Sequence, residues 1–465
     1  MSVQIRSNYG NIDTGKLIPA YSDIVAYAEG IPANILANSF NVKYICKVFI
    51  DGVVVATLKA PPNSTINNKA LFRVQSILQD HTETDKRNFN NDNASSTFEG
   101  VALKPHSIHQ IDRFARNRAN YRRVNLQGGY EYAATLGGDL IENISIFSLE
   151  FFIWNAVYQH NQGVDVVTPN EHVLDSVNSK FLTLFPNLFA STNVFLSSMQ
   201  KIQLNQYHTL AFFNGKVYGN DDDADSDVAK IRVITYDSSN AVLSTTDIDN
   251  TADNGGFGGI LDKSETKLLY CGVGTGNLSN IGVSFTNVAY YNVHARNSSD
   301  TQISAVYYFR ILDADCRGYE TIRLAFLNSK GAYDYYNFTK KSVRKQQIAR
   351  SPIKKNYGYT LDQGAFADQF NLPIYEQGTY DGGTRTYNVN AIEIIEANTD
   401  FILEEEAAIL EELFYSADVY MQNGERFEPV VISETEYIKQ TSSNDKLIQY
   451  VIAIEKGHNT RVQRL

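Results

Sequence analysis

The sequence predicts a mainly β protein, with several β-sandwich domains in tandem followed by a small α+β domain at the C-terminus. The 465 residues include 29 Tyr and 25 Phe, and aromatic residues favour strands. Asn is also abundant, which favours turns, although AT-rich codons explain the Asn equally well. Turn signals recur about every 8–15 residues in the central part of the chain, a spacing typical of sandwiches and not of βαβ units.

The first predicted domain, residues 1–135, contains the clearest hairpin. A β-rich run over Tyr44–Ile50 is followed by Asp51-Gly52 and a second β-rich run over Val53–Leu58. An Asp-Gly pair between two such runs is the strongest short-range signal for a hairpin. The strand spacing predicts an immunoglobulin- or fibronectin III-like sandwich. A second sandwich is expected over residues 136–300.

The third predicted domain, residues 301–465, combines strands with one amphipathic helix at about residues 402–415. Ala407, Leu410, Leu413 and Phe414 fall on one face of that helix. We interpret the neighbouring glutamates as the solvent-exposed face of the helix rather than as paired catalytic carboxylates. They are Glu404–Glu406, Glu411 and Glu412.

A second hairpin is predicted over Arg323–Phe338, with a two-residue turn at Lys330-Gly331. Its apolar face carries aliphatic and aromatic side chains, namely Leu324, Phe326, Tyr335 and Phe338. So many aromatic side chains on a short hairpin are typical of a surface that assembles with other subunits.

Charge and composition exclude several classes of protein. The net charge is −11, whereas a nucleic-acid-binding protein needs a basic field, so no nucleic-acid partner is expected. Two basic stretches, Arg113–Arg123 and Lys340–Lys355, are interpreted as solvated faces or as docking patches for an acidic partner. No run approaches the ~18 apolar residues of a membrane helix, and the N-terminus shows no signal peptide.

The three cysteines, Cys46, Cys271 and Cys316, have no metal-ligand spacing. So few cysteines suit folding in a reducing cytoplasm. Cys46 lies within a β-rich run and is expected to be a small core residue.

One acidic segment is a candidate calcium site. Carboxylates alternate along it, a pattern that suits hard cations, and they are Asp221, Asp223, Asp225 and Asp227. The Gly and Glu that complete an EF-hand loop are absent. A solvated acidic loop is therefore preferred over a calcium site.

Other motifs point to no chemistry. Gly272–Asn277 reads GxGxGN rather than GxGxxG, and no helix is expected after it, so it is interpreted as a loop and not as a phosphate cradle. His106 and His109 lie beside Asp112 without a third clustered ligand. No motif of a nucleophilic or metal-dependent enzyme is present, so no cofactor and no enzymatic activity are expected.

Two segments resemble a family of virion proteins from tailed phages that infect Bacteroidetes and related marine bacteria. They are Cys316–Phe338 and Phe401–Val419, and shorter similarities occur at Tyr44–Leu58 and Phe181–Pro186. Family members often carry Trp in the hairpin, where this chain has Phe326 and Tyr333. The family implies no catalytic residues.

The resemblance implies a structural, tail-associated component of a phage particle, synthesised in the host cytoplasm. The expected form is a homo-oligomeric ring or an adaptor that assembles with other tail or neck proteins and carries fibres. The alternative is a receptor- or carbohydrate-binding protein on the particle surface for host attachment, with Trp154 and exposed Tyr side chains stacking on sugars. A polysaccharide-degrading enzyme is the least favoured interpretation.

Overall fold

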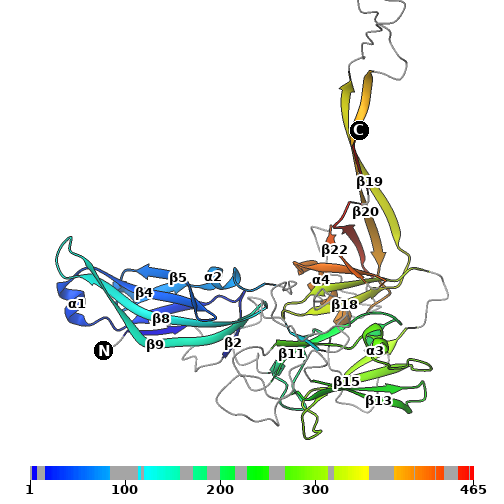
Figure 1. The fold of residues 1–465 in the computed structure, drawn as a ribbon, viewed down its shortest axis with the longest axis horizontal. Helices are drawn as coiled ribbons and strands as arrows, with labels where there is room; N and C mark the ends of the chain where they lie inside the picture. The colour runs from blue at the N-terminus through cyan, green and yellow to red at the C-terminus, as the bar shows by residue number, and fades with distance from the viewer. Residues whose placement is uncertain are drawn as a thin grey trace, which may run out of the picture. The chain divides into compact units, whose positions relative to one another are not determined.

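The structure is a computed structural model, drawn as a ribbon in Figure 1. The chain forms two compact units. Unit 1 comprises residues 1–318, 323–337 and 405–427, and unit 2 comprises residues 319–322, 338–404 and 428–465. The described residues are 3–7, 16–83, 114–116, 120–157, 171–185, 199–214, 228–250, 268–312, 319–355, 382–402, 404–424, 426–433, 449–459 and 461–464.

Two sheets of unit 1 share the first core. The smaller sheet has the order β1 (Gln4–Ser7), β3 (Val25–Glu29), β6 (Ala70–Arg73). The larger has the order β2 (Lys16–Pro19), β9 (Leu140–Trp154), β8 (Tyr121–Ala133), β4 (Phe40–Ile50), β5 (Val53–Ala60). Inward-facing side chains from both sheets form one cluster, including Ile5, Phe72, Cys46, Leu126 and Phe151. The helices α1 (Ala33–Asn38), η1 (Ser64–Ile66) and α2 (Gln75–Gln79) lie between strands in the sequence.

The β4–β5 hairpin forms as the sequence predicts. Asp51 and Gly52 have φ values of 50° and 82°, and two successive positive φ values are what a type I′ turn requires. The carboxylate of Asp51 also accepts a hydrogen bond from the backbone N–H of Arg123 at 3.0 Å, so the turn is fixed to the neighbouring strand β8. Cys46 is fully buried, as expected, and burial raises the pKa of its thiol to about 12.

Two further sheets of unit 1 share a second core. One has the order β10 (Gln200–Ile202), β16 (Tyr307–Ile311), β15 (Tyr290–Arg296), β12 (Lys230–Tyr236), β13 (Val242–Asp249). The other has the order β11 (Thr209–Phe213), β14 (Leu268–Gly272), β7 (Phe114–Arg116), and α3 (Thr275–Asn280) follows β14.

The sheet that contains β11 and β14 is buried on both faces, because alternate residues enter different clusters. Leu210 and Phe212 contribute to the second core, whereas Ala211 and Phe213 pack with Trp154 in a separate aromatic cluster. Continuous apolar runs in these strands, rather than alternating ones, reflect this two-sided burial.

The last part of unit 1 contains β17 (Ile322–Leu327), β18 (Tyr333–Phe338), α4 (Glu404–Tyr415) and β21 (Val419–Asn423), with strand order β18-β17-β21. The helix α4 confirms the amphipathic prediction. Ala407, Leu410 and Leu413 are buried along one face, whereas Phe414 is only partly buried.

Unit 2 is a sheet with the order β22 (Arg426–Ile432), β23 (Val451–Lys456), β20 (Gly383–Asn398), β19 (Val343–Lys355), and β24 (Arg461–Arg464) also pairs with β20. In Figure 1, β19 and β20 run together as a long ribbon.

The described residues confirm a mainly β fold with several sheets. The strand pairing differs from the expected boundaries at 135/136 and 300/301. The first falls inside the β8–β9 hairpin, whose strands pair along their length, and β16, beyond the second boundary, pairs with β15. No helix in the described part of the chain is long and apolar enough to cross a membrane.

Candidate functional site

Several predicted site residues lie outside the described part of the chain. These are the calcium candidates Asp221, Asp223, Asp225 and Asp227, and the cluster of His106, His109 and Asp112. Among the described residues, no group of three or more His, Cys, Asp or Glu is placed to hold a metal ion.

The interpretation of Gly272–Asn277 as a loop followed by no helix is wrong, because β14 ends at Gly272 and the short helix α3 begins at Thr275. The backbone N–H groups of Val273 and Gly274 both donate to the carbonyl of His208, at 2.8 and 3.1 Å. A cradle for phosphate needs such N–H groups unpaired, and here they are occupied.

The aromatic hairpin β17–β18 is buried within the chain. Leu324, Phe326 and Phe338 are fully inaccessible, and Tyr335 is 1% exposed. The interpretation of these side chains as an assembly surface is therefore wrong: their apolar area is already removed from water inside one molecule.

The hairpin turn has three residues rather than the predicted two. Asn328 and Ala332 close it, with the N–H of Asn328 donating to the carbonyl of Ala332 at 2.8 Å, and Gly331 adopts a φ of 81°. The side-chain oxygen of Asn328 accepts from the N–H groups of Lys330 and Ala332. This side-chain capping stabilises the longer turn.

All three carbonyls of the turn bind side chains or backbone from the first part of unit 1. The carbonyl of Ser329 accepts from the N–H of Val157 at 2.7 Å. That of Lys330 accepts from Trp154 Nε1 at 2.8 Å, and that of Gly331 accepts from Asn120 Nδ2 at 3.1 Å. Trp154 is 2% exposed, so it does not stack on a sugar as the alternative function expected.

A buried carboxylate lies next to this turn. Asp334 accepts hydrogen bonds from the hydroxyl of Thr183, from the N–H of Leu184 at 2.9 Å and from Asn328 Nδ2 at 2.8 Å. Burial raises its pKa despite these donors. In the sequence, Asp334 is the only acidic residue of an aromatic-rich strand. An acid in such a strand is expected to be buried with its hydrogen bonds formed.

Arg323 is the second buried charge of the hairpin, and it is 2% exposed. It donates to the carbonyl of Tyr207 and to Asn337 Oδ1, while its guanidinium lies 4.9 Å from the centre of the Tyr335 ring. Burial lowers its pKa to about 10. These contacts fix β17 and β18 to the loop that precedes β11.

A third group of titratable side chains lies near Lys330. The carboxylate of Glu171 pairs with Lys180 at 2.8 Å and lies 3.4 Å from His172 Nε2. Burial, with a contribution from the Lys330 charge, lowers the pKa of His172 to about 4. Burial also lowers the pKa of Lys330.

The sequence predicted that all the helix glutamates face solvent, but two of them form contacts within unit 1. Glu412 accepts from the N–H of Ser329 at 3.1 Å, and burial raises its pKa. Glu406 pairs with Lys201 at 3.2 Å. Both side chains thus hold α4 against the rest of unit 1.

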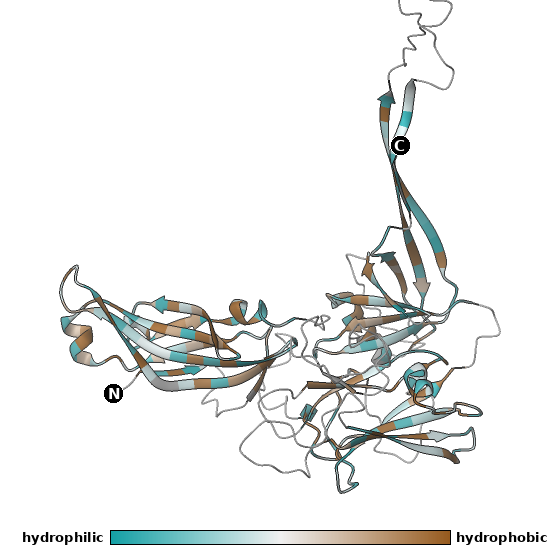
Figure 2. Ribbon diagram, viewed as in Figure 1, coloured by the Kyte–Doolittle hydropathy of each residue, from teal (hydrophilic) through white to brown (hydrophobic). Residues whose placement is uncertain are grey.

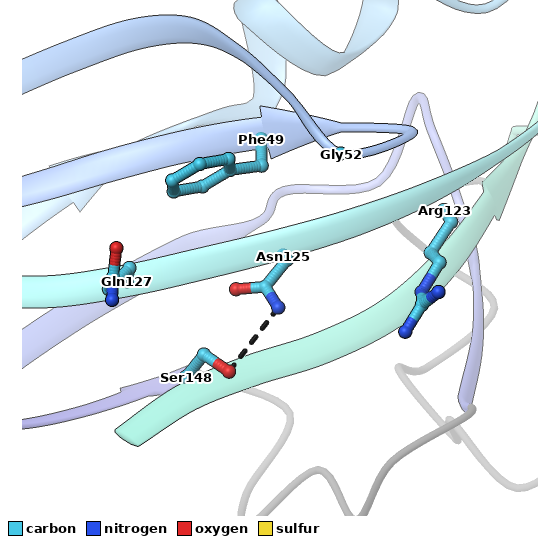
Figure 3. Close-up of a pocket in the computed structure, with 6 residues that line it drawn as sticks. All are labelled: Phe49, Gly52, Arg123, Asn125, Gln127 and Ser148. Atoms are coloured by element: carbon cyan, nitrogen blue, oxygen red, sulfur yellow. Dashed lines mark hydrogen bonds between the residues drawn. The ribbon is translucent and has the colours of Figure 1, made fainter. Parts of the chain in front are cut away.

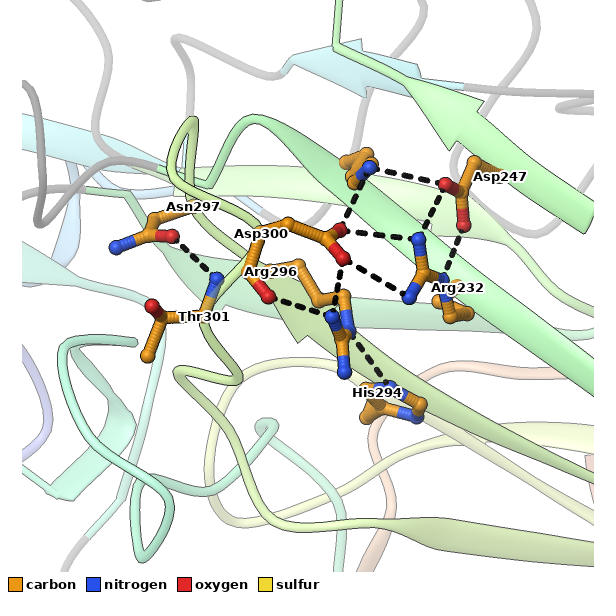
Figure 4. A network of polar contacts seen from close by, with 8 residues as sticks. Arg232, Asp247, His294, Arg296, Asn297, Asp300 and Thr301 are labelled. Atoms are coloured by element: carbon orange, nitrogen blue, oxygen red, sulfur yellow. Dashed lines mark hydrogen bonds and ion pairs between the residues drawn. The ribbon is translucent and has the colours of Figure 1, made fainter.

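Figure 4 shows an ionic network across β12, β13 and β15. Arg232 binds Asp247 through Nε and Nη2, at 2.6 and 2.7 Å, and reaches Asp300 at 3.0 Å. Lys230 bridges the same two carboxylates, and Arg296 binds Asp300 at 2.7 Å. The bond to Arg232 is the main cause that lowers the pKa of Asp247 to about 2.

His294 lies beside this network and is 4% exposed. Its Nε2 accepts from Arg296 Nε at 3.2 Å, and its Nδ1 has no hydrogen-bond partner among the described residues. Burial lowers its pKa to about 4, so the ring is neutral near pH 7. The network as a whole clamps three strands and the Asn297–Thr301 turn together.

A long exposed strand, β19, forms a ribbon with β20. Every side chain of β19 from Val343 to Lys354 is exposed. The strand is last in its sheet, so its outer edge has no strand partner among the described residues. At its outer end the ribbon has only two strands, because residues 383–387 of β20 pair with β19 alone.

The ribbon carries hydrophobic and hydrophilic residues together (Figure 2), and several of the hydrophilic residues of β19 are basic. Four large apolar side chains are between 39% and 47% exposed, namely Val343, Ile348, Ile353 and Tyr387. The predicted basic stretch coincides with β19. Arg344 and Lys345 pair with acids of unit 2, while Arg350 and Lys354 form no ion pair with the described residues.

Two polar atoms on the ribbon are buried without a partner. The Oδ1 atoms of Asn388 and Asn390 accept no hydrogen bond from the described residues. They are two positions apart on β20 and therefore lie on one face of it. Buried polar atoms are nearly always hydrogen-bonded in a complete structure.

No model of a known protein family matches this chain, and no curated protein is significantly similar in sequence.

Proposed function

We propose that this protein is a structural component of a tailed-bacteriophage virion, a tail-associated ring or adaptor that assembles with copies of itself and with other tail or neck proteins. The observation that carries the proposal is the exposed β19–β20 ribbon. The sequence resemblance to phage virion proteins supplies the setting, the virion tail.

The ribbon is hard to explain in an isolated molecule. A two-stranded hairpin is marginally stable in water, and a long exposed edge strand is a template for pairing with another chain. Contact with a neighbouring subunit would cover the exposed side chains of Ile348 and Ile353. These contacts would stabilise the ribbon in the assembled particle.

The edge of β19 is also protected against indiscriminate pairing. Its described side chains include four basic ones, Arg344, Lys345, Arg350 and Lys354, and Pro352 follows a register irregularity at Ser351. Lysine, proline and bulges are the devices by which natural proteins limit edge-to-edge aggregation. Such protection suits a surface that must accept one partner in a defined geometry, as in a closed ring.

Tandem immunoglobulin- or fibronectin III-like modules belong to the same proposal. The two-sheet cores of unit 1 support it, and rigid sandwiches of this kind are suited to carrying fibres at a tail. No catalytic step is part of the proposed function.

The first test is the mass of the purified full chain in solution by light scattering, followed by electron microscopy of virions from the same source. A closed oligomer in solution, together with a fixed copy number in the tail, is expected. The variant Ile348→Lys places a charge on the ribbon and should shift the mass towards that of a monomer. Leu243→Lys, on exposed β13, is the matched control and should keep the wild-type mass.

A monomeric wild type that is absent from virions contradicts the proposal. An oligomer whose mass is the same in the Ile348→Lys variant contradicts the role of the ribbon specifically.

A further inference from the structure

An open depression lies on the outer face of the larger N-terminal sheet (Figure 3). Its volume is about 370 Å³, near the low end of the roughly 300–1,000 Å³ of small-molecule sites. It is lined by residues of β4, the β4–β5 turn, β8 and β9: Phe49, Gly52, Arg123, Asn125, Gln127 and Ser148. The site is independent of the ribbon in unit 2.

Two amide side chains provide oriented hydrogen-bonding groups. Asn125 Nδ2 donates to Ser148 Oγ at 3.3 Å, and Gln127 Nε2 donates to the carbonyl of Ser145 at 3.0 Å. These bonds fix the orientation of the two side-chain amides and leave the oxygens of Asn125 and Gln127 available as acceptors. The hydroxyl of Ser148 can donate as well as accept.

The depression carries little net charge. Arg123 Nη2 binds Glu150 Oε2 at 2.7 Å, and this bond is the main cause that raises the pKa of Arg123. Its remaining N–H groups can still donate to a neutral oxygen. A phosphate or a sugar acid would have to compete with Glu150, so a neutral ligand fits better.

Phe49 supplies an aromatic surface at the same place. It is partly buried and pairs across the strands with Asn125 on β8 and Val54 on β5. Gly52 at the rim has open space around the position of a Cβ atom, so the approach to the ring is not obstructed there. One aromatic ring with several hydrogen-bonding groups matches a pyranose, which has an apolar C–H face and a polar rim of hydroxyls.

The sheet geometry disfavours a peptide that binds by strand addition. β8 is flanked by β4 and β9, and its backbone is paired on both sides. Strand addition needs an unpaired edge. Recognition at this face must therefore use side chains.

From these contacts we propose that the depression binds a neutral sugar residue of a glycan, with Phe49 beneath the ring and the side chains of Asn125, Gln127 and Ser148 holding its hydroxyls. This adds a recognition site to the proposed structural role and does not depend on it. A shallow site with few contacts should bind a single sugar only weakly, with a Kd of roughly millimolar order.

The test uses the full chain and three neutral probes: methyl β-glucoside, methyl β-galactoside and N-acetylglucosamine. Binding is measured by saturation-transfer NMR and by calorimetric titration. At least one probe should bind, and Asn125→Ala and Ser148→Trp should each weaken binding at least tenfold. The first variant removes an acceptor, and the second fills the depression from an exposed position.

Leu140→Ala, at an exposed position on the same strand β9, is the matched control and should bind as the wild type does. A thermal melt of each variant checks that the fold is retained. The proposal is overturned if none of the three probes binds, if both variants bind as well as the wild type, or if glucuronate binds more tightly than the neutral probes.

Discussion

Gly331 shows how a single residue connects a turn to the core around it. Its φ of 81° is accessible to glycine at little cost. A Cβ at this position would also collide with the carbonyl of Asn155 and lie 2.9 Å from Trp154 Cδ1. Both backbone conformation and space therefore require glycine here, and the Lys-Gly pair in the sequence indicated only the first of these requirements.

We expect Gly331→Ala to lower the free energy of unfolding by about 2–4 kcal/mol, because backbone strain and a steric clash add. The matched control is Gly137→Ala, where φ is 77° but nothing lies within 4 Å of the added Cβ. That variant should lose only about 1 kcal/mol. Equal losses in urea denaturation of the two variants would show that the close approach to Asn155 contributes nothing.

Buried histidines make stability depend on pH. The pKa of His172 is about 4 in the folded chain and about 6.5 when exposed. Below pH 6.5 the unfolded state binds a proton that the folded state does not, so stability falls as the pH falls from 6.5 towards 4. The full difference for His172 is roughly 3 kcal/mol, and His294 acts in the same direction.

Urea denaturation between pH 7.5 and pH 4.5 measures this dependence. His172→Gln removes one titrating group and should flatten the curve, whereas His458→Gln, at an exposed position, should not. A pH dependence that is the same in the wild type and in the His172→Gln variant would contradict the buried, neutral state of the ring.

At the scale of elements, local patterns predicted most strands but not where their faces lie. Asp51-Gly52 predicted the β4–β5 turn because the turn conformation is set by those two residues alone. The helical spacing of the apolar residues in α4 likewise predicted its buried face. The hairpin at residues 323–338 was identified as a hairpin, but its aromatic face was assigned to other subunits, because the side chains that cover it come from distant parts of the sequence.

The candidate sites were predicted less well for the same reason. Asn125, Gln127 and Ser148 come together only when β8 pairs with β9, and no short motif records that pairing. The exposure of β19 follows from its position as the last described strand of its sheet, which the local sequence does not reveal. Its basic composition did predict a solvated face or a docking segment.

The helix α4 gives a direct test of an element's two faces. Leu410 is fully buried and Tyr415 is 62% exposed. Leu410→Ala should cost about 2–5 kcal/mol through lost burial and a cavity. Tyr415→Ala should change stability by less than about 0.5 kcal/mol, since its hydroxyl makes only an exposed bond to Glu411. Similar melting temperatures for the two variants would contradict the packing of α4.

At the scale of the whole molecule, the compact units do not follow the order of the chain. Three separate segments build unit 1, and three others build unit 2. The tandem arrangement of domains expected from the sequence assumed that each core closes within one continuous segment. In unit 1, however, Trp154 binds Lys330, and Asn120 binds Gly331, so residues near 120–157 need the hairpin almost two hundred positions later.

This interleaving predicts the behaviour of truncated chains. A fragment of residues 1–318, the first segment of unit 1, keeps β16 and the strands of the second core but lacks the β17–β18 hairpin, α4 and β21. Trp154 and Tyr207 would lose the hairpin that covers them, and an apolar surface of this kind favours aggregation. The fragment should therefore bind a hydrophobic dye and lose the near-ultraviolet circular dichroism of Trp154, while the full chain does neither. A monomeric, cooperatively melting fragment with the native aromatic signal would show instead that the first two cores are closed without the hairpin.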